Sequence, residues 1–201
     1  MKTITVTFAL IAIFFLSCEQ DYNPYGNGYN NNNNYTYPET YSLQTWVSED
    51  WDHWEYDIGD TTGSLQTWVS EDWDHWEFNI EGMEGDIATW TSEDWDHWEL
   101  SCGSLTFDIS TWTSSDWDYW EVTESSSGFS ADVRTWTSDD FDRWEVNAGD
   151  SLKLDIATWT SEDWDHWEFS GDVGNFTIPQ LAAVLFVPVY TSSIHMRGID
   201  Q

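Results

Sequence analysis

The feature that most constrains this chain is an eleven-residue unit, rich in Trp and Asp, that occurs six times. The unit reads TWTSEDWDHWE at Thr89–Glu99, and successive copies begin 22, 22, 22, 24 and 23 residues apart. The six copies are Thr45–Glu55, Thr67–Glu77, Thr89–Glu99, Thr111–Glu121, Thr135–Glu145 and Thr158–Glu168. Because the spacing changes only between copies, we expect each copy to be one rigid element and the insertions to lie in surface turns.

Alternating stretches flank each unit, such as Asp86-Ile87-Ala88-Thr89 before it and Trp98-Glu99-Leu100 after it. Thr, Trp, Val, Ile and Phe at a period of two residues predict β-strands. Each repeat is therefore predicted to form a β-hairpin, which gives about twelve antiparallel strands. A short helix capped by Ser92 is the alternative, but at about eight residues it would be marginal.

The length of the hairpin tip sets the predicted pairing of the two strands. A four-residue tip, Glu93–Asp96, places Thr91 opposite Trp98 and Trp90 opposite a Glu. One face of the hairpin is then apolar, with Val69 among its members in the second repeat. The other face is polar except for one Trp.

Crowding of like charges decides between two ways of assembling the hairpins. A parallel β-solenoid with 22-residue coils would stack identical residues about 4.8 Å apart. Four acidic positions in each repeat would then form ladders of like charge, and repulsion would cost roughly 1 kcal/mol for each neighbouring pair even in water. A hairpin meander doubles that separation. We therefore predict an all-β fold, either a curled antiparallel sheet or a closed barrel, with the solenoid as the alternative.

The net charge excludes several classes of partner. Asp and Glu number 38 against 5 Lys and Arg, which gives a formal charge of -33. Nucleic acid is an unsuitable partner because phosphate binding needs a basic surface. An anionic membrane surface is disfavoured for the same reason.

The first residues predict export and lipid anchoring. One Lys precedes an apolar stretch of 13 residues, Ile4–Leu16, which is typical of a signal peptide and too short to span a bilayer. Phe15-Leu16-Ser17-Cys18 resembles the lipobox of bacterial lipoproteins, although Phe15 stands where that family usually has Leu. The resemblance implies removal of residues 1–17 and lipidation of Cys18. The acidic residues that follow are similar to leaders of surface-exported lipoproteins of the Bacteroidetes group.

The remaining segments complete the predicted organisation. Residues 18–41 are rich in Asn and Tyr and form a tether, residues 42–171 hold the six repeats, and the apolar residues 172–201 cap the repeat core. Cys18 and Cys102 are the only cysteines, so if Cys18 is lipidated the fold cannot rest on disulfides.

All 17 Trp residues lie within the units and form three rows. The row near the end of each unit is predicted to fill the core, and the row in each turn to fold over one face as a lid. The row on the polar face is the candidate ligand-binding set, either as a saccharide platform or packed against a second layer. Its members are Trp46, Trp68, Trp90, Trp112, Trp136 and Trp159.

Each turn also carries two Asp residues, which are candidate calcium ligands because Ca²⁺ takes six to eight oxygens. Solvated turn acids are the alternative interpretation. The pairs are Asp50/Asp52, Asp72/Asp74, Asp94/Asp96, Asp116/Asp118, Asp140/Asp142 and Asp163/Asp165.

No motif for nucleophilic, phosphate or zinc chemistry occurs in the sequence. A catalytic carboxylate pair is normally unique in a domain, whereas this pattern repeats six times and suits multivalent binding. We therefore predict a non-catalytic, surface-anchored binding or adhesion lipoprotein of the cell envelope, with glycans or cell-surface molecules as partners. The alternative is a structural envelope protein that calcium stabilises.

Overall fold

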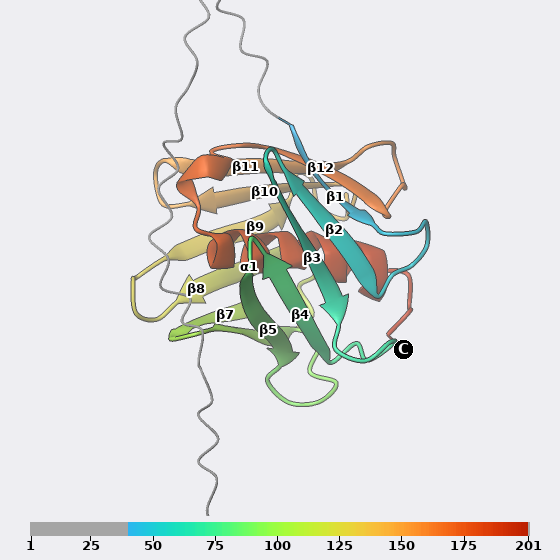
Figure 1. Ribbon diagram of the computed structural model, residues 1–201, viewed down its shortest axis with the longest axis horizontal. Helices are drawn as coiled ribbons and strands as arrows, with labels where there is room; N and C mark the ends of the chain where they lie inside the picture. Colours follow the sequence, from blue (N-terminus) through green and yellow to red (C-terminus); the bar gives the residue numbers. More distant parts are fainter. Residues whose placement is uncertain (1–39, 201) are drawn as a thin grey trace, which may run out of the picture.

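The computed structural model describes residues 40–200, which form a closed antiparallel β-barrel around a central helix (Figure 1). Twelve strands follow one another around the wall, and β1 pairs with β12 to close it. The strands are β1 (Tyr41–Thr45), β2 (His53–Ile58), β3 (Thr61–Thr67), β4 (His75–Ile80), β5 (Met83–Thr89), β6 (His97–Cys102), β7 (Leu105–Thr111), β8 (Tyr119–Glu124), β9 (Ser130–Thr135), β10 (Arg143–Ala148), β11 (Leu152–Thr158) and β12 (His166–Gly171). This confirms the predicted all-β meander in its barrel form, and the solenoid alternative is wrong.

The two ends of the barrel differ in their connections. At one end, which we call the loop end, each of the six repeats contributes a seven-residue loop, such as Trp90–Asp96 between β5 and β6. At the other end, the turn end, the connections include two-residue turns such as Glu81-Gly82. The irregular repeat spacing comes from the turn end, where residues 125–129 and 149–151 form longer connections.

The predicted four-residue tip is wrong, although the predicted faces survive. Thr89 pairs with Trp98, and the backbone N–H of Trp90 donates to the carbonyl of His97 at 3.0 Å. The difference arises because two successive turns, Thr91–Asp94 and Asp94–His97, fill the loop. A slip by an even number of residues leaves every strand residue on its predicted face. Thr91 and Val69, in contrast, leave the sheet and are exposed.

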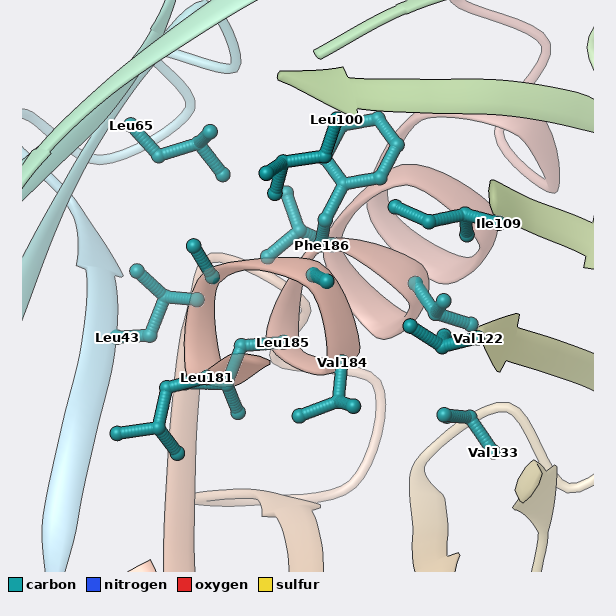
Figure 2. Packing of buried hydrophobic residues seen from close by; sticks show 14 of the residues in the cluster. Leu43, Leu65, Leu100, Ile109, Val122, Val133, Leu181, Val184, Leu185 and Phe186 are labelled. Carbon is teal, nitrogen blue, oxygen red and sulfur yellow. The ribbon is translucent and has the colours of Figure 1, made fainter. Parts of the chain in front are cut away.

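The predicted C-terminal cap segment lies inside the barrel, where α1 (Ile178–Pro188) continues into a π-helical stretch, η2 (Val189–His195). An eight-stranded barrel is just filled by its own side chains, so twelve strands leave a wider interior that needs additional filling. Figure 2 shows helix residues Phe186, Leu185 and Leu181 surrounded by strand residues such as Leu100 and Leu65. The apolar C-terminal segment is thus the centre of the core.

The central helix continues past Pro188, which lacks the N–H for an ordinary helical hydrogen bond. The π-helical geometry of η2 follows at once, as is common where the regular ladder is interrupted. The stretch Ile178–His195 has the length and hydropathy of a membrane span, but 89% of it is buried inside the barrel. A short 3-10 helix, η1 (Val173–Asn175), joins β12 to α1.

Residues 1–39 lie outside the described part of the chain. The predicted signal peptide, lipidated Cys18 and most of the tether therefore stay predictions.

Candidate functional site

The candidate ligand-binding tryptophans all lie where a strand enters a long loop, on the outer side of the wall. Their side chains are 51–63% exposed, which makes them the largest exposed apolar side chains of the described residues. We call them the rim tryptophans: Trp46, Trp68, Trp90, Trp112, Trp136 and Trp159. The alternative in which this row packs against a second layer of the same fold is wrong, because no such layer covers it within residues 40–200.

Each rim tryptophan is supported from behind by the first residue of the next strand. Trp90 stacks on His97 with ring centroids 5.1 Å apart and an interplanar angle of 1°, and Trp112 stacks on Tyr119 at 5.4 Å. In the fifth repeat the Arg143 guanidinium lies 4.1 Å from the ring centre of the rim tryptophan. The predicted pairing of the rim tryptophan with a Glu is wrong, because the register places His97 opposite Trp90 and Glu99 opposite Ala88.

The second Asp of each pair joins its loop to the loop of the next repeat. Asp74 accepts hydrogen bonds from the hydroxyl of Ser92 at 2.7 Å, the backbone N–H of Glu93 at 3.0 Å and the hydroxyl of Thr89 at 3.2 Å. The same Ser-to-Asp bond occurs at all six junctions, and Ser48 to Asp165 closes the ring between the last repeat and the first. These carboxylates therefore hold the six loops as one continuous ring.

The Asp bonds also stabilise an unusual backbone. The fifth residue of every unit has a positive φ of 62–66° although none is glycine: Glu49, Glu71, Glu93, Ser115, Asp139 and Glu162. A non-glycine residue rarely adopts this left-handed conformation, which costs of order 1–3 kcal/mol. A carboxylate that accepts the N–H of this residue, as Asp74 does for Glu93, offsets that cost.

The two carboxylates of one loop titrate differently because they interact. Hydrogen bonding to Asp52, with desolvation and repulsion, raises the pKa of Asp50 above 3.8. Desolvation alone would raise the pKa of Asp52, but hydrogen bonds from Ser70, Asp50 and the backbone of Glu71 lower it overall. The same opposite shifts of pKa occur at Asp94/Asp96 and Asp163/Asp165.

The candidate calcium ligands meet only in pairs. Within residues 40–200, no group of three or more His, Cys, Asp or Glu side chains is placed to hold a metal ion. Two carboxylates fall short of the six to eight oxygens that Ca²⁺ takes. The first Asp of each pair sits where the two turns of its loop meet: Asp50, Asp72, Asp94, Asp116, Asp140 and Asp163.

Asp118 shows how the second Asp of a pair is held by the following repeat. Its carboxylate accepts from the hydroxyl of Ser138 at 2.6 Å and from the backbone N–H of Asp139 at 2.8 Å. The hydroxyl of Thr135 donates a third bond at 3.1 Å. Both carboxylate oxygens of Asp118 thus accept hydrogen bonds from the next repeat and join the two loops, and its role as a calcium ligand stays a prediction.

Asp142 is held in the same way. Its carboxylate accepts from the hydroxyl of Ser161 at 2.6 Å and from the backbone N–H of Glu162 at 3.0 Å. The indole Nε1 of Trp164 donates to it as well, at 2.6 Å, so Asp142 also fixes the turn aromatic of the next repeat. The remaining second residues of the pairs likewise accept a hydrogen bond from a Ser: Asp52, Asp74, Asp96 and Asp165.

The other two rows fill and close the barrel. The core row is 0–1% exposed, as predicted, and consists of Trp54, Trp76, Trp98, Trp120, Trp144 and Trp167. Each turn aromatic folds over the loop end, packing against the core. Trp98 Nε1 donates to the carbonyl of Trp95 at 2.9 Å, and the Trp95 ring stacks on Tyr190 of the central helix. The rim therefore rests on a rigid, closed base.

The sequence contained a signal for the Asp–Ser bonds, since the fourth position of every unit is Ser and the eighth is Asp. Their partnership was missed because it joins neighbouring repeats rather than residues of one hairpin. Predicting it requires the barrel order.

The loop end thus presents six indole rings on a fixed ring of loops, and these loops also carry acidic residues. Such a surface can stack on apolar sugar faces and accept hydroxyl protons. Comparison of the chain with protein-family models, with curated proteins and with solved structures finds no match.

Proposed function

We propose that this chain is a non-catalytic binding or adhesion lipoprotein of the bacterial cell envelope, which binds glycans through the rim tryptophans. The observation that carries the proposal is the exposure of one Trp in every repeat, 51–63% of its surface, on a rigid scaffold. Burying an indole contributes large apolar area, so a protein gains nothing for its fold by leaving six of them exposed. Repetition around one rim suits multivalent contact, in which weak sites add avidity.

Titration with soluble polysaccharides, followed by Trp fluorescence and by calorimetry, tests the glycan part of the proposal. Binding should change the emission of the exposed indoles and should be lost when all six rim tryptophans are replaced by Ser. The six-site variant should keep its cooperative unfolding, because the core row is untouched. Unchanged emission and no heat with every polysaccharide would remove the glycan proposal.

Anchoring is tested on the exported protein. We expect a mature chain that begins at Cys18, carries acyl groups and lies in the outer membrane, on the cell surface. Mass spectrometry of the membrane fraction should show the lipid mass, and Cys18→Ser should release the chain from membranes. A mature protein in which Cys18 instead forms a disulfide with Cys102 would contradict the anchor.

The calcium alternative predicts a different behaviour. If calcium between the Asp pairs stabilises the fold, a chelator should lower the melting temperature and added calcium should restore it. We expect no shift, since Ser and backbone donors already satisfy the second Asp of each pair. A fall of several degrees with chelator would favour the structural role.

A further inference from the structure

The outer wall of the barrel is not equally smooth on all sides. A depression of about 590 Å³ lies over β1 to β4, and a second one of about 570 Å³ lies over β3 to β6. The two depressions adjoin at the cross-strand pair Ser64 and Asn79, which lines both, and we call the two together the wall groove. A third depression, of about 510 Å³, lies at the turn end of β9 to β11 and does not include Arg134, the outward residue nearest a rim tryptophan there.

Two glycines create the groove. Gly63 and Gly85 point inward at equivalent positions of β3 and β5, opposite Tyr56 and Phe78. A Cβ atom on Gly63 would lie 2.6 Å from the carbonyl oxygen of Asn79, and one on Gly85 would lie 2.4 Å from the Phe78 ring. The wall can approach the core so closely only without side chains at these two sites. Later repeats carry Phe107, Ala131 and Leu154 at the same position.

The side chains above the groove also differ from those of the other repeats. In repeats one and two the outward residues before the rim tryptophan are Ser42 and Gln44, and Ser64 and Gln66. In the other four repeats an Asp replaces this Ser, and Ala, Ser or Arg replaces the Gln. Those four Asp residues are Asp86, Asp108, Asp132 and Asp155.

In three of the later repeats this Asp pairs with a His or an Arg on the neighbouring strand, which a Ser cannot do. Asp86 bonds to His75 at 3.2 Å, Asp108 bonds to His97 at 2.8 Å, and Asp155 lies 3.7 Å from Arg143. In repeats one and two, Ser42 and Ser64 replace this Asp and cannot form an ion pair with the His or Arg of the neighbouring strand. The outward residues there are hydroxyls and amides. These two repeats therefore present hydrogen-bonding groups that are not committed to a charged neighbour.

The groove ends one outward position before two of the rim tryptophans. Gln44 and Gln66 line it, and Trp46 and Trp68 are the next outward positions, just past the ends of β1 and β3 and about 7 Å further along. Because Gln44 lies in line with Ser64 rather than with Gln66, the two tryptophans are two strand spacings apart across the wall and two residues apart along it, or about 12 Å. That separation is close to the length of a disaccharide unit in an extended glycan.

The chemistry of the lining selects the type of glycan. Amides of Gln44 and Gln66 donate and accept hydrogen bonds, and carboxylates such as Glu55 and Glu77 accept hydrogen bonds from hydroxyl groups. The Asn79 amide is already engaged, since it donates to Glu84 at 3.0 Å and accepts from the N–H of Gly82 at 3.2 Å. Among residues 40–200, no Lys or Arg lines either depression, so a sugar carboxylate or sulfate would have no counterion there. An uncharged, hydroxyl-rich chain fits both the amides and the acids.

Resting on the proposed function, we infer that the wall groove is the specific site of this protein for an uncharged oligosaccharide, with Trp46 and Trp68 stacking on successive disaccharide units. The other four rim tryptophans then add weak, unspecific contacts.

Calorimetric titration of the full chain with hexasaccharides tests this inference. The probes are cellohexaose, laminarihexaose and mannohexaose as neutral chains, with hexagalacturonate as the anionic and deacetylated chitohexaose as the cationic comparison. The groove variant is Gln44→Ala with Gln66→Ala, which introduces the residue that Ala88 and Ala157 already provide in other repeats. The matched control is Ser110→Ala with Arg134→Ala, at the same position of repeats four and five.

A second pair of variants separates groove from rim. Trp46→Ala with Trp68→Ala is compared with Trp112→Ala with Trp136→Ala, and Ser64→Asp installs the acid found in later repeats. All should fold, since each changes an outward residue. We expect at least one neutral hexasaccharide to bind, and the groove variant, the first Trp pair and Ser64→Asp each to weaken it about tenfold or more. The two controls should change affinity less than about twofold.

Three outcomes would overturn the inference. Equal losses from the groove variants and their matched controls would place binding on the whole rim, leaving the proposed function intact. Tighter binding of the cationic or anionic hexamer than of the neutral ones would overturn the chosen ligand class. Absence of binding by any hexasaccharide or polysaccharide would remove the glycan proposal and this inference together.

Discussion

Two Trp residues of the same hairpin, eight positions apart, lie in opposite environments. Trp98 is completely buried against the central helix, while Trp90 is 63% exposed at the rim. Alternation along the strands sends one indole inward and the other outward. The difference shows that repetition of a residue type has two separate causes here. The inner row is explained by packing and by one hydrogen bond, whereas packing does not explain the outer row.

The largest effect should come from breaking the inner row. We expect Trp98→Ala to lower the free energy of unfolding by about 3–5 kcal/mol, because it leaves a cavity beside Phe186 and Tyr190. Trp98→Phe keeps most of the volume but leaves the Trp95 carbonyl without its indole donor, so it should cost about 1–2 kcal/mol. Urea denaturation measures both. A loss below 1 kcal/mol for the Ala variant would contradict the assignment of this row to the core.

The two Asp residues of each loop also differ, since the second accepts hydrogen bonds from the next repeat and the first is the less tightly held. Their substitutions should give the next largest effect on stability. Asp74→Ala removes three accepted hydrogen bonds and should destabilise the barrel by about 1–3 kcal/mol. Asp72→Ala should change stability by less than about 0.5 kcal/mol, because among residues 40–200 its carboxylate does not accept a set of hydrogen bonds like the three of Asp74. Thermal melting of the pair decides the matter. Equal costs would mean that the ring of Asp–Ser bonds does not stabilise the loops.

The sequence predicted the elements whose information is local. Hairpins, faces and the buried row follow from alternation, and an even slip of register left them unchanged. The exact loop could not be predicted. Its seven residues fold as two turns that require a positive φ at Glu93, and the sequence has no glycine there to indicate it.

The long-range features were harder to predict for the same physical reason. The role of Asp118 and Asp142 depends on donors from the following repeat, which come into reach only when neighbouring hairpins pair. The need for a central helix follows from the width of a twelve-stranded barrel, which is known only once the barrel closes. Exposure of the rim row likewise depended on whether a second layer existed. The wall groove depends on Gly63 and Gly85, whose effect on the curvature of the wall appears only when neighbouring strands are in place.

A smaller effect, below about 1 kcal/mol, should appear in the pH dependence of stability. The lowered pKa of Asp52 means that its carboxylate stabilises the fold above pH 3.8, and that this contribution is lost as pH falls through the folded pKa. The raised pKa of Asp50 has the opposite sign, so its ionised form disfavours the fold at neutral pH. Asp52→Asn should therefore be destabilising at pH 7 and Asp50→Asn neutral or stabilising. Both differences should shrink as the pH falls below 4 in urea titrations, and shifts of the same sign would contradict the paired assignment.

The smallest effect on stability should come from the outer row. Trp90→Ala removes an indole that stacks only on His97 and is otherwise exposed to solvent, so the free energy of unfolding should change by less than about 0.5 kcal/mol. The variant should also lose part of the red-shifted emission and part of the quenching by acrylamide, since exposed indoles dominate both signals. Trp112→Ala, whose ring stacks on Tyr119, provides a matched second site. If either substitution destabilised the barrel as much as Trp98→Phe, the rim would be part of the folding core. The exposure of this row would then no longer argue for a ligand.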